Sequence, residues 1–152
     1  IGTDRDDLIR AWEKSTPGFR QRLETIERLR AERFWIVPTL SPFALWEDLP
    51  SVLHRFVELE IPYITVLFFK QHPPGAYAAT TPVWFLDYLK QEYPMLLDRD
   101  WQSGQLMMMR SIYGDNRVLD GQPGFESLTR PHVTIGDVSS PLEKRRVELA
   151  SD

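Results

Sequence analysis

Polar side chains stand where strands are expected to end at three places in this chain, and they are the first candidates for chemistry. These are Thr3 and Asp4, then Thr39 and Ser41, then Lys70, Gln71 and His72. In β/α proteins, the groups that bind or react gather where strands end. The ammonium of Lys70 comes directly after the apolar run ITVLFF, and it could there bind a carboxylate or a phosphate. An exposed lysine that merely ends a strand is the alternative, and the sequence leaves both open.

The chain lacks the residue types and spacings of several well-known sites. It contains no cysteine, so it offers no thiolate to zinc or to an iron-sulfur cluster. Its histidines, His54, His72 and His132, have neither the HxH nor the HExxH spacing, and we predict no metal site. Nucleophile-elbow, Walker and Gly-x-Gly-x-x-Gly motifs are also absent from the sequence.

Composition is that of an ordinary globular protein. The chain has 152 residues, of which 42% are apolar and 26% charged, and its formal net charge is −4. The acidic balance argues against a sequence-independent nucleic-acid binder. No apolar run reaches the roughly 18 residues of a membrane span, so we expect no membrane association. Residues 1–7 have no signal-peptide character, and we expect a cytoplasmic protein.

Hydrophobic periodicity predicts alternating helices and strands. Helices are expected over residues 6–12, 17–30, 47–58, 82–92 and 94–110. Thr3 or Asp4 is expected to cap the first helix, and Thr16 the second. Short apolar runs at 34–40 and 64–69 have the composition of strands buried on both faces, and the first is expected to end or to bulge at Pro38. This alternation predicts right-handed crossovers and a parallel sheet.

The predicted fold class is α/β, and the chain divides into two parts. Residues 1–110 form a partial (β/α) barrel of parallel strands and amphipathic helices. Residues 111–152 are rich in Gly, Asp, Asn and Pro at their start, and we expect an irregular C-terminal extension. Within it, one short strand is expected over 132–135 and a last helix over 141–150.

A series of short motifs resembles one part of the radical S-adenosylmethionine (SAM) enzymes. The motifs are Gly2-Thr3-Asp4, Ala11-Trp12-Glu13, Ser15-Thr16-Pro17, Arg22-Leu23-Glu24 and Pro38-Thr39-Leu40-Ser41-Pro42. Their order resembles the middle of that barrel, most of all in the spore-photoproduct-lyase-like branch. Residues 85–94 resemble the late helix of that branch, and the whole resemblance covers roughly residues 1–115. The Cys-x3-Cys-x2-Cys loop of the family is absent, so it lies upstream of Ile1 or has been lost in a degenerate barrel.

The resemblance implies a set of binding residues. Thr3, Glu13, Thr39 and Ser41 would contact SAM, while Lys70 and Gln71 would face the substrate. The implied reaction is reductive cleavage of SAM by a [4Fe-4S] cluster held outside this chain, after which a 5′-deoxyadenosyl radical takes hydrogen from the substrate. Structural roles are the alternative, since Thr3 can cap a helix, Glu13 can be an exposed helix-end carboxylate, and Ser41 can be a turn residue.

Two functions are consistent with these observations. The first is the C-terminal half of a radical SAM enzyme, whose missing N-terminal half or partner chain carries the cluster. The second is a non-catalytic partial-barrel module for binding or assembly, whose sheet edge pairs with another chain. A nucleic-acid substrate is a further hypothesis, since aromatic and cationic side chains could line a single-stranded groove. Those side chains are Tyr77, Trp84, Trp101, Arg110, Tyr113 and Arg117.

Overall fold

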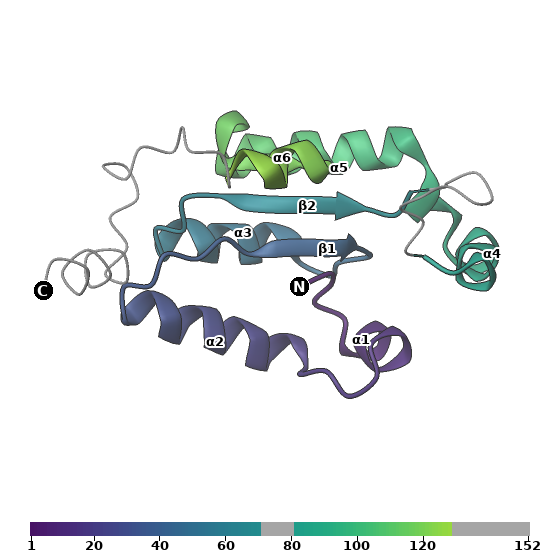
Figure 1. The fold of residues 1–152 in the computed structure, drawn as a ribbon, viewed down its shortest axis with the longest axis horizontal. Helices are drawn as coiled ribbons and strands as arrows, with labels where there is room; N and C mark the ends of the chain where they lie inside the picture. Colours follow the sequence, from purple (N-terminus) through teal and green to yellow (C-terminus); the bar gives the residue numbers. More distant parts are fainter. Residues whose placement is uncertain (71–80, 129–152) are drawn as a thin grey trace, which may run out of the picture.

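A three-stranded parallel sheet is the central element of the protein. The computed structural model describes residues 1–70 and 81–128, and the order of the strands in the sheet is β1-β2-β3 (Figure 1). The strands are β1 (Thr39–Phe43), β2 (Ile64–Phe68) and β3 (Val118–Asp120). Thr65 of β2 pairs with Thr39 of β1 on one side and with Leu119 of β3 on the other. The prediction of an α/β protein with a parallel sheet is therefore confirmed.

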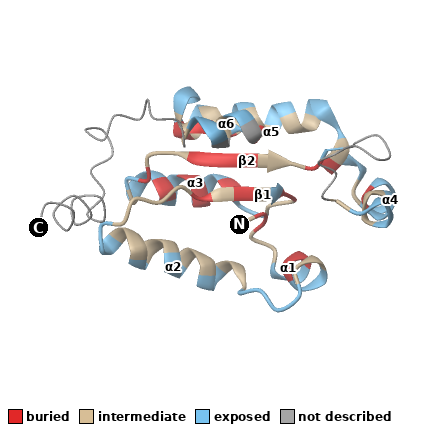
Figure 2. Cartoon of the chain, in the orientation of Figure 1, coloured by how far each residue is buried: buried red, intermediate tan, exposed pale blue. Residues whose placement is uncertain are grey.

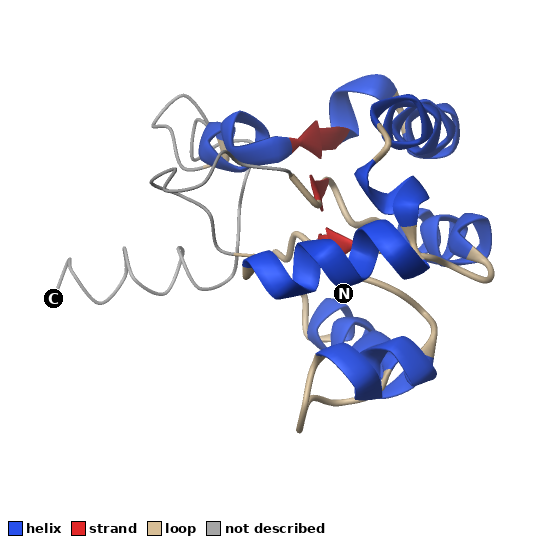
Figure 3. Cartoon of the chain, turned by 90° about the vertical axis from the view of Figure 1, so that its right-hand side faces the viewer, coloured by secondary structure: helices blue, strands red, loops and turns tan. Residues whose placement is uncertain are grey.

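The helices surround this sheet on both faces and at one end. The longest elements are α2 (Phe19–Ala31), α3 (Leu49–Glu58), α4 (Val83–Glu92) and α5 (Arg99–Tyr113), and the shorter ones are α1 (Asp6–Trp12), η1 (Pro94–Leu97) and α6 (Gly121–Ser127). α3 and α5 pack together on one face, and α6 lies against β2 and β3 on the other (Figure 3). α2 runs alongside β1 at the edge of the sheet, while α1 and α4 lie beyond the carboxyl ends of the strands (Figure 1).

The main core fills the space between the sheet and the helices α3 and α5. Leu40, Ile64 and Val66 of the strands meet Phe56 of α3 and Met109 of α5, and all five side chains are fully buried. In Figure 2 the buried stretches of β1, β2 and α3 are coloured red. Burial of each such side chain stabilises the fold by roughly 1.5–3 kcal/mol. The alternation of strand and helix therefore produces one apolar layer between the sheet and this pair of helices.

Helix α3 shows how local sequence specifies an element. Its buried residues, Leu49, Val52, Leu53 and Phe56, recur at helical spacing. The carboxylate of Asp48 caps the helix by accepting a hydrogen bond from the Ser51 nitrogen at 3.2 Å. Hydrogen bonding from Ser51 holds the pKa of Asp48 below its ordinary value. The helix predicted over 47–58 is confirmed, with a start two residues later than expected.

Strand β1 lies further along the chain than predicted, so the strand over 34–40 is wrong. Pro38 stands before the first strand residue, and its carbonyl oxygen accepts a hydrogen bond from the Thr65 nitrogen at 3.0 Å. A proline has no N–H but keeps its acceptor, so it suits the start of a strand as well as its end. Ser41 and Pro42, joined by a cis peptide bond, belong to the strand, and the pairing is irregular between Leu40 and Phe43.

The predicted helix caps are wrong because the side chains bond elsewhere. The Asp4 carboxylate accepts hydrogen bonds from the nitrogens of Glu47 and Asp48, both at 2.8 Å, and so holds the loop before α3. α1 begins after Arg5 without a side-chain cap. α2 begins after Gly18, and its first nitrogen, that of Phe19, donates to the Asp6 carboxylate at 2.9 Å. The acceptor for α2 therefore comes from the preceding helix instead of from Thr16.

Residues 111–127 form regular structure, so the prediction that they are irregular is wrong. α5 continues to Tyr113 and is followed by the 3-10 turn η2 (Asp115–Arg117), by β3 and by α6. β3 has only three residues, and it is a strand because its backbone pairs with β2. The strand predicted over 132–135 and the helix predicted over 141–150 lie outside the described residues.

The first residues run beside β1 in the same direction as that strand. The amino nitrogen of Ile1 donates to the Thr39 oxygen at 2.7 Å, and the Ala44 nitrogen donates to the Gly2 oxygen at 2.9 Å. Ascending residue numbers thus face ascending residue numbers, as in a parallel pair. Across residues 1–70 and 81–128, no helix has the length and apolar character needed to cross a membrane.

Candidate functional site

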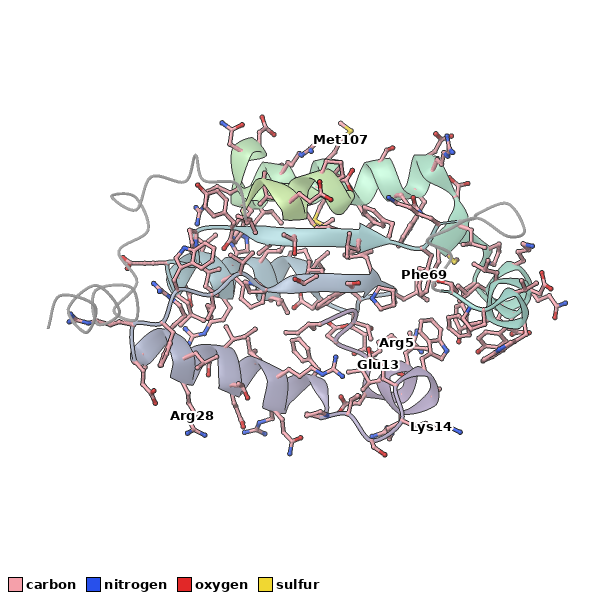
Figure 4. The ribbon with its side chains drawn as sticks, viewed as in Figure 1. Arg5, Glu13, Lys14, Arg28, Phe69 and Met107 are labelled. Carbon is pink, nitrogen blue, oxygen red and sulfur yellow. The ribbon has the colours of Figure 1, made fainter. Side chains whose placement is uncertain are left out.

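An apolar cluster covers the carboxyl edge of the sheet on the side of β1. Its buried centre consists of Ala44, Phe69, Leu89 and Leu96. The ring of Trp12 lies edge-on to those of Phe85 and Tyr93, with 5.5 Å between the centroids in each pair. Phe69 lies on the side of the strands that faces α4 (Figure 4). This cluster anchors α1 and α4 over the end of β1.

A cavity of about 570 Å³ opens beside this cluster, at the carboxyl ends of β2 and β3. Its apolar wall includes Phe68, Leu97 and Leu106, and its polar groups are Lys70, Arg99, Gln102, Ser103 and Asp120. The volume lies within the range that small-molecule sites occupy. Lys70 lies two residues after β2 ends at Phe68, and Asp120 is the last residue of β3. The parallel pairing of these two strands therefore brings both side chains to one edge.

Helix α5 supplies the opposite wall, and two side chains fix its first turns. The carboxylate of Asp98 caps the helix by accepting hydrogen bonds from the nitrogens of Asp100 at 2.7 Å and Trp101 at 3.0 Å. The amide nitrogen of Gln102 donates to the oxygens of Phe69 at 3.1 Å and Leu96 at 2.8 Å. Gln102 thus ties α5 to the end of β2, which sets the positions of its neighbours in the helix.

Among the described residues, the charged side chains of the cavity are not neutralised in pairs. Lys70 and Arg99 are exposed cations, and Asp120 is an exposed carboxylate. Within residues 1–70 and 81–128, none of the three forms an ion pair. The Lys70 ammonium lies close to the start of α6, since a Cβ on Gly121 would be 3.7 Å from its nitrogen. The cavity therefore carries a formal charge of +1 and exposes donors and an acceptor together.

Lys70 is the predicted substrate residue that lies in this cavity. Gln71, the second predicted substrate residue, lies outside the described residues, as do His72 and Tyr77. The predicted position of Lys70 at the end of a strand is confirmed, because β2 ends at Phe68. Its contact with a substrate stays a prediction.

Two of the predicted SAM residues make bonds within the chain. Thr3 is buried, with its hydroxyl donating to the Leu45 oxygen and accepting from the Arg5 nitrogen at 3.1 Å. Glu13 lies just after α1 (Figure 4), where its carboxylate forms an ion pair with Arg22. Thr3 lies beside the carboxyl end of β1, and no strand of the described residues ends at Thr3 itself.

The other two predicted SAM residues belong to β1 itself. Thr39 is its first residue, and it stands at the amino end of the strand instead of the carboxyl end. Its hydroxyl accepts a hydrogen bond from that of Thr65 at 2.8 Å. Ser41 lies in the middle of the strand. The structure therefore does not bring the hydroxyls of Thr3 and Thr39 together, and the SAM contacts stay predictions.

Sequence reasoning missed most of the cavity. Asp120 escaped notice because β3 was not predicted, and a three-residue strand carries no periodic signal. Arg99 and Ser103 occur among the polar positions of an amphipathic helix, where exposed residues are the ordinary case. The cap at Asp98, followed by the helix, was a signal that could have fixed the start of α5.

Comparison with protein families, with curated proteins and with solved structures finds no match for this chain. The geometry of the described residues and the chemistry of the cavity therefore have to support any function. Those residues contain no group of three or more His, Cys, Asp or Glu side chains that could hold a metal ion.

The residues proposed for a nucleic-acid groove do not form one aromatic surface. Tyr113 is buried in the main core, and Trp101 packs against the ring of Phe43 at a centroid distance of 5.9 Å. Trp84 of α4 is 71% exposed. Bases stack on exposed rings, so Tyr113 is not available as a stacking platform.

Proposed function

We propose that this chain is the C-terminal half of a radical SAM enzyme and that its cavity at the carboxyl edge receives the substrate. The observation that carries the proposal is the sequential parallel order β1-β2-β3 with a polar cavity at the ends of β2 and β3. A (β/α) barrel has this order, and its active site lies at the carboxyl ends of its strands. The hydrogen bonds that Ile1 and Gly2 form with Thr39 and Ala44 place the first residues beside β1, on the side away from β2, where a barrel would have its preceding strand.

The iron-sulfur cluster does not fit this chain. A [4Fe-4S] cluster is held by cysteine thiolates, and the sequence contains no cysteine. The proposal therefore assigns the cluster to a segment or chain other than this one. The role of this chain is to bind and orient the substrate through Lys70 and the groups that share its cavity. This role does not depend on the SAM contacts predicted for Thr3, Glu13, Thr39 and Ser41.

The encoding gene tests the proposal first. We expect the reading frame upstream of Ile1, or a partner gene, to encode a Cys-x3-Cys-x2-Cys segment. The assembled protein, reconstituted anaerobically with iron and sulfide, should then show cluster absorption and release 5′-deoxyadenosine from SAM. Lys70→Met should leave the cluster absorption unchanged and lower the product formed from the substrate. Absence of the cysteine segment from both genes would reject the enzyme.

A second candidate is a non-catalytic binding or assembly module that pairs with another chain. The apolar side chains exposed on α4 favour it, because Val83 is 69% and Trp84 is 71% exposed. Large exposed apolar side chains that lie together are typical of interaction surfaces. Light scattering on the protein at increasing concentration tests pairing between two copies. We expect Trp84→Ser to lower the association if α4 forms the interface, whereas a protein that stays monomeric throughout excludes self-assembly.

A further inference from the structure

Two cations from separate elements face the same cavity. Lys70 follows β2, and Arg99 begins α5, so 29 positions of sequence separate them while the fold brings both to one wall. No carboxylate oxygen of the described residues lies within 4.0 Å of either cation. Arg55 of α3 and Lys90 of α4, by comparison, have carboxylate oxygens at about 3 Å, as Lys90 has that of Asp87 at 3.0 Å. Among residues 1–70 and 81–128, both positive charges are therefore unshared and available to a ligand.

Hydrogen-bond acceptors stand in the same cavity. The carboxylate of Asp120 is an acceptor when ionised, and no described cation shares it. The amide nitrogen of Gln102 is already used by the oxygens of Phe69 and Leu96, which leaves its own carbonyl oxygen as the group that can meet a ligand. The cavity thus combines cationic donors with acceptors that require an O–H or N–H from the ligand.

We propose that this cavity binds a small molecule that carries an oxyanion group, a phosphate or a carboxylate, and that also donates a hydrogen bond from a hydroxyl or an amine. Lys70 and Arg99 bind the oxyanion, since a guanidinium and an ammonium both pair with such oxygens. Asp120 accepts the hydrogen bond from the hydroxyl or amine. That this molecule is a substrate rests on the function proposed above, whereas its binding in the cavity does not.

Binding of matched ligands to the protein tests the proposal and distinguishes the two oxyanions. Calorimetric titrations use inorganic phosphate, then glycerol 3-phosphate against propyl phosphate, and lactate against propionate. We expect the hydroxylated ligand of a pair to bind more tightly than its partner. Binding in the phosphate pair alone identifies a phosphate site, and binding in the carboxylate pair alone identifies a carboxylate site. If neither pair binds, the proposal is wrong.

Variants assign the binding to the cavity. Lys70→Met and Arg99→Ala should each weaken binding about tenfold or more, because a hydrogen bond to a charged group is lost. Asp120→Asn should keep the oxyanion bound and reduce the advantage of the hydroxylated ligand. Lys90→Ala is the matched control, since Lys90 is an exposed lysine of α4 that does not line the cavity, and it should change nothing. Circular dichroism verifies that each variant is folded.

Two results overturn the inference. One is equal loss of binding in Lys90→Ala and Lys70→Met, which indicates non-specific attraction. The other is unchanged binding in both Lys70→Met and Arg99→Ala. Oxyanion binding needs no iron-sulfur cluster, so it can be observed even if the protein fails to assemble one. If no cluster assembles but the oxyanion still binds, the proposed enzyme function is therefore rejected and the proposed oxyanion site stands.

Discussion

The guanidinium of Arg117 lies over the ring of Tyr113, with its Cζ 4.5 Å from the ring centroid, and both side chains donate hydrogen bonds to the oxygen of Ile61. Arg117 also donates to the Pro62 oxygen at 2.9 Å. Tyr113 ends α5, and Ile61 and Pro62 form the connection from α3 to β2. These two side chains therefore link the connection from α3 to β2 with the connection from α5 to β3. The link lies at the amino edge of the sheet, where β3 starts beside β2.

Removal of the Tyr113 hydroxyl should weaken the fold in a way that depends on pH. Tyr113→Phe should lower the free energy of unfolding by about 1 kcal/mol near neutral pH, because a buried hydrogen bond is lost. Burial raises the pKa of Tyr113 to about 12 in the folded protein, from an ordinary value of 10.0. The unfolded chain thus releases the proton first as the pH rises, which stabilises the unfolded state of the wild type.

The advantage of the wild type over Tyr113→Phe in unfolding free energy should therefore shrink as the pH rises above 10 and reverse before about pH 12, because the raised pKa corresponds to more free energy than the hydrogen bond of about 1 kcal/mol supplies. Urea titrations at pH 8, 10 and 11 measure it, with the m-value as a check that both proteins unfold alike. Titration of the other tyrosines and of the lysines cancels in the difference between the two proteins. A difference that stays constant over this range would contradict the buried, protonated hydroxyl.

Removal of either hydroxyl of the Thr65–Thr39 hydrogen bond should destabilise the fold, but by different amounts. Thr65 is fully buried and donates to the Thr39 hydroxyl, which lies at a partly exposed position. Thr65→Val should cost about 1 kcal/mol, while Thr39→Val should cost about 1–3 kcal/mol because it leaves a buried hydroxyl without an acceptor. The double variant should recover part of the sum. Denaturant midpoints for the four proteins measure the coupling, and additive losses would count against the bond.

Alanine should have opposite effects at two glycines. A Cβ on Gly2 would collide with the Pro42 oxygen, so Gly2→Ala should push the first residues away from β1. We expect the free energy of unfolding to fall by about 1–3 kcal/mol. Gly104 lies inside α5 with nothing within 4 Å of its added Cβ, and Gly104→Ala should raise stability by about 0.5–1 kcal/mol. Thermal unfolding of both variants gives the two signs, and a neutral Gly2→Ala would show that this pairing contributes little.

The cap of α5 should matter for the cavity as well as for stability. Asp98→Ala removes the acceptor for two backbone nitrogens and should cost about 1 kcal/mol. Asp98→Asn keeps an acceptor at the same place and should be nearly neutral. Urea titration measures both, and oxyanion binding to Asp98→Ala should weaken because Arg99 and Ser103 stand in the first turns of the frayed helix. Equal stability of the two variants would show that the cap is not formed in solution.

Elements with strong local signals were predictable, and those defined by pairing were not. α3 and α4 follow from helical periodicity, and β2 follows from the apolar, β-branched run over residues 64–69. The run before Pro38 has the same composition, but the backbone bonds that define β1 begin only at the Pro38 oxygen. A residue is in a strand because a neighbouring chain segment bonds to it, and composition does not identify that neighbour.

The residues of the cavity likewise divide into one that local sequence predicts and four that only the fold brings there. Lys70 was predicted because it follows an apolar run directly. Arg99, Gln102, Ser103 and Asp120 lie between 29 and 50 positions further along, and nothing local links them to Lys70. Gln102 joins α5 to the end of β2 through two backbone oxygens, and the pairing of β2 with β3 brings Asp120 to the same edge.

By itself the sequence determined the α/β class, the lack of any thiolate ligand and the placement of Lys70 after a strand. Periodicity, composition and residue counts are local properties, so they can be read without a fold. Only the tertiary structure decided that the hydroxyls of Thr3 and Thr39 are bonded within the chain and that Lys70 and Arg99 share a cavity. Those outcomes depend on which distant donors and acceptors the parallel register brings within hydrogen-bond distance.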